Sequence, residues 1–476
     1  MSHIPSALPA ELAIGIVHLG LGAFHRAHQA VYTEDAIQQA GGDWGICAVA
    51  MRSRELATVM LENNGRYSLI EQQADGPELR ELSVIREVLC LPDSPGMVIQ
   101  RISDPAVHLV SVTVTEKGYC FSGPDRHLNT DDPLIMHDLA NPSQARSMPG
   151  ILVAGLRQRR ESGGTGLSIL SCDNLPANGK LLRQIVLSHA ALLDAELAQW
   201  IEQNCRFPDS MVDRITPAAT VATLTLASDL LGRADPAAIE TEPFRQWVIE
   251  DDFAGPRPAW EKAGAQFVAD VAPFEDMKLR MLNGAHSLIA YLGAVSGLPA
   301  VRDVMQVSAY RTLLDHHMAM AAETLEGMDK EDAAGYRAQL LERFENPAID
   351  HRCLQIAMDG SQKMPQRILT PASIRLARGM TVDTYALATA LWVRYLMGRD
   401  EQGAAIDCSD PLIGQLQLIF NASDAMSQRI AGLGRIPGVP QDLFNQAHWV
   451  DQVADLVNAS NTHGVRAVVS ELVDSI

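Results

Sequence analysis

Four side chains suited to acid–base chemistry and hydrogen bonding lie within one short stretch, Phe274–His286. The stretch has no proline and is rich in leucine and methionine, which predicts a helix. At about 100° per residue, with Lys278 at zero, Glu275 lies at about 60° and His286 at about 80°. Asn283 lies at about 140° on the same wheel. We interpret this shared face as a catalytic helix on which a desolvated Lys278 carries a proton; the alternative is a helix with a mixed, partly hydrated face.

A second stretch has the pattern of a phosphate-binding turn. The apolar run Ile14–Leu19 predicts a buried parallel strand, which ends at Gly20-Leu-Gly22 before a predicted helix. A strand, a glycine turn and a helix N-terminus form the phosphate-binding part of a dinucleotide fold. His25 stands where that motif has its third glycine. Arg26, in the first turn of the helix, could face a pyrophosphate or could belong to a solvated helix start.

The next predicted strand, Trp44–Met51, leads into Arg52-Ser53-Arg54. In an NAD site an acidic residue usually ends this strand and binds the ribose hydroxyls. Arg52 or Arg54 could instead meet the 2′-phosphate of NADP, so the choice between the two cofactors stays open. The alternative is that both are surface arginines.

Polar residues also follow two later strands. Val107–Thr115 is a strongly apolar run that continues into Glu116-Lys117, and Gly166–Ser171 is followed closely by Asn174. Open α/β sheets bind ligands at the carboxyl ends of their strands, so these residues are candidates for a site. An Asx turn or a helix N-cap would explain Asn174 without any ligand.

The composition is that of a globular protein, and it narrows the function. The net charge of −20 over 476 residues argues against nucleic acid or an anionic membrane as a partner. Seven widely spaced cysteines without a CxxC pair indicate reduced thiols in a cytoplasmic protein. We expect no signal peptide, no transmembrane helix and no metal site, because no stretch has the required length or ligand spacing.

The chain is too long for one ordinary core, and its character changes near residue 272. We predict an α/β fold with a dinucleotide-binding domain over 1–272 and a mostly α-helical substrate and catalytic domain over 273–476. We expect a linker over 207–217, an irregular connection over 243–252 and a cationic loop over 360–367. A helix is predicted to begin after that loop, with Thr370 as its N-cap.

Several stretches together resemble the polyol-specific long-chain dehydrogenases, the mannitol dehydrogenase family. They are His18–His28, Thr113–Tyr119, Ser171–Asn174, Phe207–Pro217, Glu242–Asp251 and Lys278–His286. The resemblance implies a zinc-independent, NAD(P)-linked secondary alcohol dehydrogenase that often works as a monomer. It also implies a Rossmann-type first domain followed by a mostly helical second domain.

The resemblance assigns catalytic roles residue by residue. Lys278 would be the general acid/base, and Asn174 and Asn283 would be the amides that polarise the carbonyl. His286 would hold a substrate hydroxyl, and Glu275 resembles the carboxylate that gates proton exit to water. These roles suit the chemistry, because hydride transfer to a ketone builds negative charge on oxygen that each amide donor can stabilise by about 3 kcal/mol. The lysine is useful only if its pKa falls towards neutrality.

Binding roles follow from the same resemblance. Asp213 would be a substrate or supporting contact. The residues expected around the dinucleotide are Gly20, Gly22, Ala23, Phe24, Arg26, Met51, Arg52, Thr115 and Glu116. Lys117, Lys363 and Arg367 stand in sequences that look more like the fructuronate reductase branch than the mannitol branch, and an arginine with a nearby lysine suits a carboxylate. Alternatively, Lys117 pairs with Glu116 or with the cofactor, and Arg367 is structural.

These observations favour reversible reduction of D-fructuronate to D-mannonate with NAD, NADP not being excluded. The second hypothesis is a dehydrogenase of a neutral polyol such as mannitol or arabinitol. A nucleotide-binding sensor that has lost catalysis is the least favoured, because every matched catalytic residue is present.

Overall fold

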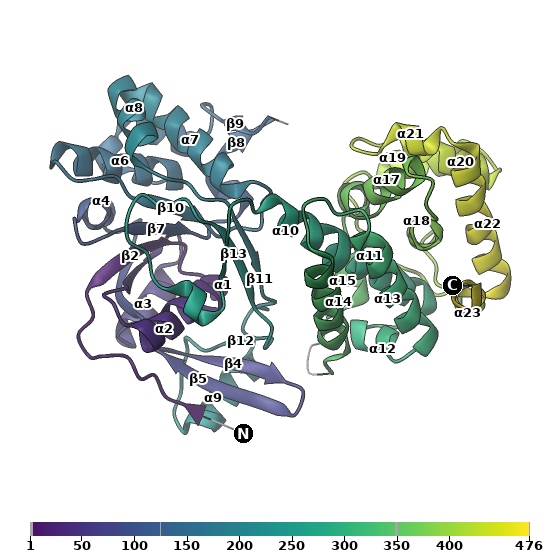
Figure 1. The fold of residues 1–476 in the computed structure, drawn as a ribbon, viewed down its shortest axis with the longest axis horizontal. Helices are drawn as coiled ribbons and strands as arrows, with labels where there is room; N and C mark the ends of the chain where they lie inside the picture. Colours follow the sequence, from purple (N-terminus) through teal and green to yellow (C-terminus); the bar gives the residue numbers. More distant parts are fainter. Residues whose placement is uncertain (1–2, 124, 348–350, 476) are drawn as a thin grey trace. The chain divides into compact units, whose positions relative to one another are not determined.

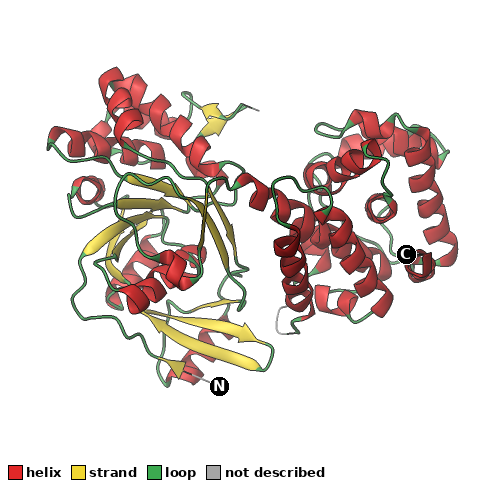
Figure 2. Ribbon diagram, in the orientation of Figure 1, coloured by secondary structure: helices red, strands yellow, loops and turns green. Residues whose placement is uncertain are grey.

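The structure is a computed structural model that describes residues 3–123, 125–347 and 351–475. The chain forms two compact units, Met1–Ala272 and Pro273–Ile476, each described below by itself. The first unit combines strands with helices, whereas the described part of the second is built from helices (Figure 1, Figure 2). The predicted fold class, a Rossmann-type domain followed by a mostly helical domain, is confirmed.

A parallel sheet forms the centre of the first unit. Its strands lie in the order β10-β7-β2-β3-β6. Their bounds are β2 Ile14–Leu19, β3 Gly45–Ala50, β6 Ile85–Cys90, β7 Leu109–Val112 and β10 Ser168–Ser171. The strand order reverses between β2 and β7, which is the switch point where Rossmann folds bind dinucleotides.

Helices cover both faces of this sheet. They are α1 Ala23–Ala27, α2 Gln29–Ala40, α3 Arg54–Glu62, α4 Pro95–Ser103, α5 Pro133–Ala140, α6 Met148–Glu161, α7 Asn178–Leu193 and α8 Ala195–Asn204, whereas α9 Val221–Leu231 packs against Ile70 and Leu79 of a smaller sheet. Successive strand residues point to opposite faces. Val17 therefore joins an apolar cluster with Leu152 of α6, and Ile16 joins another with Val31 of α2. Two covered faces explain why these strands are apolar throughout.

Three smaller sheets complete the first unit. The order β1-β5-β4-β12 joins His3–Ile4, Gly76–Leu82, Tyr67–Gln73 and Ile239–Thr241. The order β11-β13-β14 joins Ser210–Asp213, Gln246–Glu250 and Gln266–Val268, and β8 Phe121–Ser122 pairs with β9 His127–Leu128.

The expected linker over 207–217 and the expected irregular connection over 243–252 were wrong. Each holds a strand, and β11 and β13 pair antiparallel with Met211 opposite Val248. Both strands are short and flanked by proline, so their buried residues do not stand out as a periodic run in the sequence.

The second unit is a bundle of helices. Their bounds are α10 Ala272–Met277, α11 Gly284–Ser296, α12 Val301–Met305, α13 Ser308–Ala322, α14 Lys330–Glu345, α15 Cys353–Ala357, α16 Gly360–Met364, α17 Thr370–Ala377, α18 Asp383–Leu396, α19 Ile413–Asn421, α20 Met426–Gly432, α21 Gln441–Phe444, α22 Ala447–His463 and α23 Val465–Ser475. π-helical segments lie at Lys278–Asn283 (η4) and Pro365–Leu369 (η5), and 3₁₀ segments at Glu116–Tyr119 (η1), Pro142–Gln144 (η2), Trp260–Ala263 (η3) and Leu433–Arg435 (η6).

The expected cationic loop over 360–367 is also wrong. This segment is helical, since α16, η5 and α17 follow one another without a break. Thr370 has helical backbone angles and is not an N-cap. Pro371 lacks the amide hydrogen that would bond four residues back, and the widened π-turn just before it is where a helix can absorb such a loss.

Candidate active site

The glycine turn after β2 is held between the ends of two neighbouring strands. Gly20 has a φ of +119°, and a β-carbon there would lie 2.0 Å from the carbonyl oxygen of Thr113 at the end of β7. The amides of Gly20 and Leu21 both donate to the carbonyl of Val49 on β3, at 3.0 and 3.1 Å. No residue with a side chain fits at this position, so the close approach explains the first glycine.

A pair of buried imidazoles lies beneath this turn. His18 Nε2 lies 3.0 Å from the carbonyl oxygen of Gly20 and 2.8 Å from the hydroxyl of Thr113. Burial lowers the pKa of His18 to about 3, so the ring is neutral at pH 7. His25 is buried and stacks on His18 with ring centroids 3.4 Å apart. His25 therefore fills the space behind the turn and does not bind phosphate.

Arg26 does not face a pyrophosphate, contrary to the expectation. Its guanidinium is buried, donates to the carbonyl of Ala237 and lies over the ring of Tyr67. It ties α1 to the segment before β12. The helix periodicity could not show this, because the partner is more than 200 positions away in the sequence.

A cavity of about 810 Å³ opens at the carboxyl ends of β2, β3 and β7. Gly20, Gly22, Met51, Arg52 and Thr115 line it as expected for the dinucleotide, whereas Ala23, Phe24, Arg26 and Glu116 do not. Its other residues include Arg54, Lys117, Cys120 and Arg146. Among the described residues, its wall carries cationic side chains and no carboxylate, although the whole chain has a net charge of −20. This lining fits a dinucleotide with its anionic pyrophosphate.

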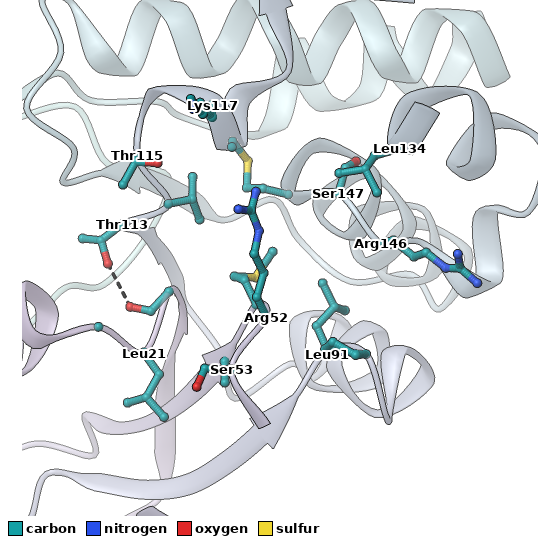
Figure 3. A pocket seen from close by; sticks show the side chains of 18 of the residues that line it. Leu21, Arg52, Ser53, Leu91, Thr113, Thr115, Lys117, Leu134, Arg146 and Ser147 are labelled. Carbon is teal, nitrogen blue, oxygen red and sulfur yellow. Dashed lines mark hydrogen bonds between the residues drawn. The ribbon is translucent and has the colours of Figure 1, made fainter. Parts of the chain in front are cut away.

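The two arginines at the end of β3 differ in their surroundings. Arg54 is bound to Asp93, with Nε 2.7 Å from the carboxylate. Arg52 has no hydrogen bond or ion pair within the described chain, and Figure 3 shows it extending across the middle of the cavity. Lys117 lies in the same wall and forms no ion pair with Glu116 among the described residues. The structure thus places Lys117 where it can reach a dinucleotide.

The loop after β7 is strained and is braced from β10. Thr115 has φ +65° and ψ 165°, a region that residues other than glycine rarely adopt. The carboxylate of Asp173, just after β10, accepts from the amides of Val114 and Thr115 at 3.1 and 2.9 Å and from the hydroxyl of Tyr119 at 2.9 Å. Asp173 is therefore structural, and it fixes the backbone that presents Thr115 to the cavity.

Two asparagines near Asp173 differ in their surroundings: Asn178 is buried and structural, and Asn174 is exposed. The buried amide of Asn178 bonds the carbonyls of Asp173 and Ser210, so it joins the ends of β10 and β11. Asn174 instead lies exposed in the bend after β10. Asp213 is buried at the end of β11.

In the second unit, the stretch that carries Lys278 is helical but is not a regular α-helix. α10 passes into the π-turn η4, Lys278–Asn283, which passes into α11. A π-turn holds one extra residue, so everything after it rotates back by about 100°. Asn283 then moves from about 140° to about 40° and His286 from about 80° to about −20° relative to Lys278. The four polar residues share a narrower face than the regular wheel predicts.

Lys278 is buried at the start of η4, with 8% of its surface exposed. Glu275 is half-buried in the first turn of α10, where a carboxylate also complements the helix dipole. Asn283 is half-buried, and its carbonyl accepts from the hydroxyl of Ser287 at 3.1 Å.

His286 lies in a buried, positively charged environment. Its ring packs 4.8 Å from that of Phe344 and 5.4 Å from that of His351. Burial, and then the proximity of His351, Arg343 and Arg367, hold the pKa of His286 well below its usual value. The imidazole is therefore neutral at pH 7 and offers one donor and one acceptor.

Arg367 and Lys363 are not equivalent. Arg367 stands on η5, and its Nη1 points at the carbonyl of Asn283 and the hydroxyl of Ser287, at 3.5 and 3.4 Å. Its Nε and Nη2 make no hydrogen bond within the residues that the structure describes. The Lys363 amine donates to the carbonyls of Ile356 and Met358, at 3.3 and 2.6 Å, and lies 3.9 Å from the carboxylate of Asp359.

Gly284, the first residue of α11, packs closely against the backbone of η5. A β-carbon there would lie 3.2 Å from the carbonyl oxygen of Arg367 and 3.4 Å from Nε2 of His317. The small residue lets η4 and η5 approach closely, so Arg367 lies beside Asn283.

Arg343 and His351 are site candidates that the sequence interpretation missed. Arg343 is buried at the end of α14, and His351 precedes α15. Both lie more than 50 positions from His286, so no spacing rule connects them. The sequence holds no signal for either residue, because the burial of Arg343 and its proximity to His286 are results of tertiary folding.

Within the described residues, no group of three or more His, Cys, Asp or Glu side chains has the arrangement of a metal site. The described helices include none that is long and apolar enough to span a membrane.

Known proteins share the two-domain organisation described above. The family models Mannitol dehydrogenase Rossmann domain and Mannitol dehydrogenase C-terminal domain match residues 14–262 and 270–459. D-mannonate oxidoreductase of Escherichia coli K12 is 44% identical over 99% of this chain and 99% of its own length.

Two solved structures are similar over nearly the whole chain. The structure of Pseudomonas fluorescens mannitol 2-dehydrogenase with NAD and D-mannitol has a TM-score of 0.80 and 34% identity, and it covers 100% of this chain and 97% of its own. A substrate-free D-sorbitol dehydrogenase has a TM-score of 0.93 and 31% identity, with 98% and 97% covered. The resemblance drawn from the sequence is thus confirmed: the chain belongs to the mannitol dehydrogenase family of oxidoreductases.

Proposed function

We propose that the protein is a polyol or sugar-acid dehydrogenase that reversibly reduces the ketone of D-fructuronate to D-mannonate. The observation that carries this choice is the positive environment of His286, where Arg343 and Arg367 both act on the buried ring. A neutral polyol gives the half-buried Arg367 no anion to bind, whereas a uronate brings a carboxylate. The 44% identity to a D-mannonate oxidoreductase supports the same choice.

Arg367 is the proposed carboxylate ligand. Its Nε and Nη2 are uncommitted among the described residues, and its position is fixed by the bonds from Nη1 to Asn283 and Ser287. A guanidinium held at one nitrogen can still present two parallel donors to a carboxylate. Lys363 is withdrawn from this role, because its amine serves two backbone carbonyls.

The cofactor is a nicotinamide dinucleotide, and when bound it supplies the hydride that adds to the carbonyl carbon. Lys278 gives its proton to the developing alkoxide, so that the product is a neutral secondary alcohol, and takes the proton back in oxidation. Asn283 and Asn174 donate hydrogen bonds to the same oxygen, each worth about 3 kcal/mol in the transition state. Neutral His286 binds a neighbouring hydroxyl, Glu275 returns a proton from water to Lys278, and Asp213 is a supporting contact.

We propose NAD(H) as the cofactor. NADP(H) is kept as the alternative because of the side chains that line the cavity at the end of β3. The cavity has no carboxylate for ribose hydroxyls, and Arg52 lies in it without an ionic partner among the described residues. A parallel assay of D-mannonate oxidation with NAD and with NADP decides between them.

The test of the substrate is a panel of D-mannonate, D-mannitol and D-arabinitol, assayed with wild type and Arg367→Met. We expect mannonate to be the best substrate. Losing one charge-assisted bidentate contact, worth about 1.5–3 kcal/mol, should lower kcat/KM for mannonate about 10- to 150-fold. Arg378→Met removes an exposed arginine that pairs with Glu326 and is the matched control. Mannitol oxidation that exceeds mannonate oxidation would reject the uronate proposal in favour of a neutral polyol.

We also propose that the protein is a cytoplasmic monomer. Its turnover is proposed to need no metal ion. Dialysis against EDTA should leave the rate unchanged, and full recovery of activity only after Zn²⁺ addition would contradict this.

A further inference from the structure

A second cavity, of about 660 Å³, lies within the helical unit. Its wall comes from the end of α18, the turn that follows it and the junction of α22 with α23, and includes Arg394, Arg399, Arg466, Asp400 and Glu401. The turn is joined to the far end of α11, where the amide of Glu401 donates to the carbonyl of Val295 at 2.9 Å. The cavity thus lies at the opposite end of α11 from the π-turn that carries Lys278.

Arg394 is the unusual residue in this wall. Only 7% of its surface is exposed, and its Nε is enclosed without a hydrogen-bond partner. Within the described chain it forms no hydrogen bond and no ion pair. The other buried arginines of the described chain are Arg26, Arg159, Arg214, Arg343 and Arg375, and each of them has a partner.

The carboxylates nearest to Arg394 are already occupied. One oxygen of Asp400 accepts from the amides of Gln402 and Ala404, at 3.0 and 2.7 Å. Glu401 accepts from the amide of Val465 at the start of α23, at 2.9 Å. They raise the pKa of Arg394 against the lowering effect of burial, but neither lies close enough to form an ion pair with it. A buried guanidinium left in this state is costly unless an anion or ordered water binds it.

Two further cations face the same space. Arg399 is exposed and donates from Nη1 to the carbonyl of Gly403 at 2.9 Å, and Arg466 is exposed on the first turn of α23. Together with Arg394 they bring three guanidinium groups from three elements to one wall. Amide and hydroxyl side chains of Gln402, Asn461 and Thr462 line the remainder.

We infer that this cavity is a binding site for a small hydroxylated oxyanion, separate from the catalytic residues. The oxyanion is bound by Arg394 with Arg399 and Arg466, and the hydroxyl groups of the ligand are bound by the amide side chains and the carboxylates. A phosphate or a carboxylate can supply the oxyanion, since both match guanidinium geometry.

The test is thermal unfolding of the full-length protein in Tris chloride, without other anions. The probes are glucose 6-phosphate, glucuronate and glucose at matched ionic strength; all three are six-membered-ring sugars that differ only in the group at carbon 6. We expect one of the two anions to raise the Tm of wild type by several degrees and glucose to leave it unchanged. The anion with the larger effect identifies the phosphate or the carboxylate as the natural group.

Arg394→Met is the site variant, and Arg375→Met is its matched control. Arg375 is equally buried but bonds the carbonyl of Met320 and the carboxylate of Glu323, at 2.8 and 2.6 Å. Without ligand, Arg394→Met should melt at or above the wild-type Tm, because it removes an unpartnered charge, whereas Arg375→Met should melt several degrees lower. The shift caused by the anion should be smaller in Arg394→Met than in wild type.

Three results would overturn the inference. They are equal anion-induced shifts in wild type and Arg394→Met, no shift with either anion, and a loss of Tm in Arg394→Met as large as in Arg375→Met. The first would show that the anion binds elsewhere, and the last would show that Arg394 is structural. None of these measurements depends on turnover, so they are independent of the proposed substrate.

Discussion

Asp173→Asn is expected to weaken dinucleotide binding through the strained loop that Asp173 braces. Thr115 stands at φ +65°, ψ 165°, which costs about 1–3 kcal/mol for a residue with a branched β-carbon. The carboxylate offsets this cost by accepting two backbone amides and the hydroxyl of Tyr119. An asparagine has one acceptor oxygen and would place an NH₂ group against at least one donor.

The loss of one or two charge-assisted bonds amounts to about 2–4 kcal/mol. If half of it falls on the bound conformation of the loop, the dissociation constant for the dinucleotide rises about 5- to 30-fold. The remainder lowers the free energy of unfolding. Fluorescence titration with NADH and NADPH measures the first quantity, and thermal unfolding measures the second.

Thr115→Gly gives this reasoning its sharpest test. Glycine adopts the observed backbone angles without strain, so in the Thr115→Gly background the hydrogen bonds of Asp173 no longer offset a strained conformation. Asp173→Asn should therefore lower the free energy of unfolding by about 1–3 kcal/mol less in the Thr115→Gly background than in the wild-type background. Additivity within about 0.5 kcal/mol would refute the link between brace and strain. Asp209→Asn also removes a carboxylate bonded to two amides, those of Gly179 and Lys180, and should lower stability without changing dinucleotide affinity.

Three further predictions concern the catalytic, cofactor and buried ionisable residues. Lys278→Ala should lower kcat about 10²- to 10⁴-fold while the dinucleotide dissociation constant stays within twofold; full turnover would remove the acid/base role. Arg52→Glu should shift the NAD/NADP ratio of kcat/KM towards NAD by at least 10-fold, and an unchanged ratio would show that Arg52 does not meet the cofactor. The pKa of His317 is lowered to about 3 by burial, so its neutral form stabilises the fold fully above pH 6.5 and this contribution is lost as the pH falls from 6.5 towards 3. At pH 5 the loss is about 2 kcal/mol, and His317→Asn, which can keep the bond to Thr384, should show that much less acid destabilisation in urea titrations.

Much of the first unit follows from the sequence alone. The apolar runs before Gly20, at Trp44–Met51 and at Gly166–Ser171 are strands because parallel strands are buried on both faces. The glycine turn was recognisable because its spacing reflects a steric need. The role of Arg26 was not recognisable, because burial of an arginine depends on a carbonyl brought near by tertiary folding.

The second unit shows a different limit. The helix that carries Lys278 was predicted, but its π-turn was not, because no propensity separates a π-turn from an α-helix over six residues. The grouping of His286 with Arg343, His351 and Arg367 depends on four separate segments. Sequence similarity identified Arg367 as a candidate, whereas only the fold shows that Lys363 is committed elsewhere.

The π-turn at Lys278–Asn283 has a consequence for alignment and engineering. A helix with one residue too many per turn is equivalent to a single-residue insertion that later packing has retained. Deleting one residue there would restore the regular ladder and leave Asn283 and His286 at about 40° and −20° relative to Lys278, the angles that the π-turn gives them. A relative that lacks one residue in this segment can therefore keep the same polar face on a regular α-helix, whereas a further one-residue insertion would turn that face by about 100°.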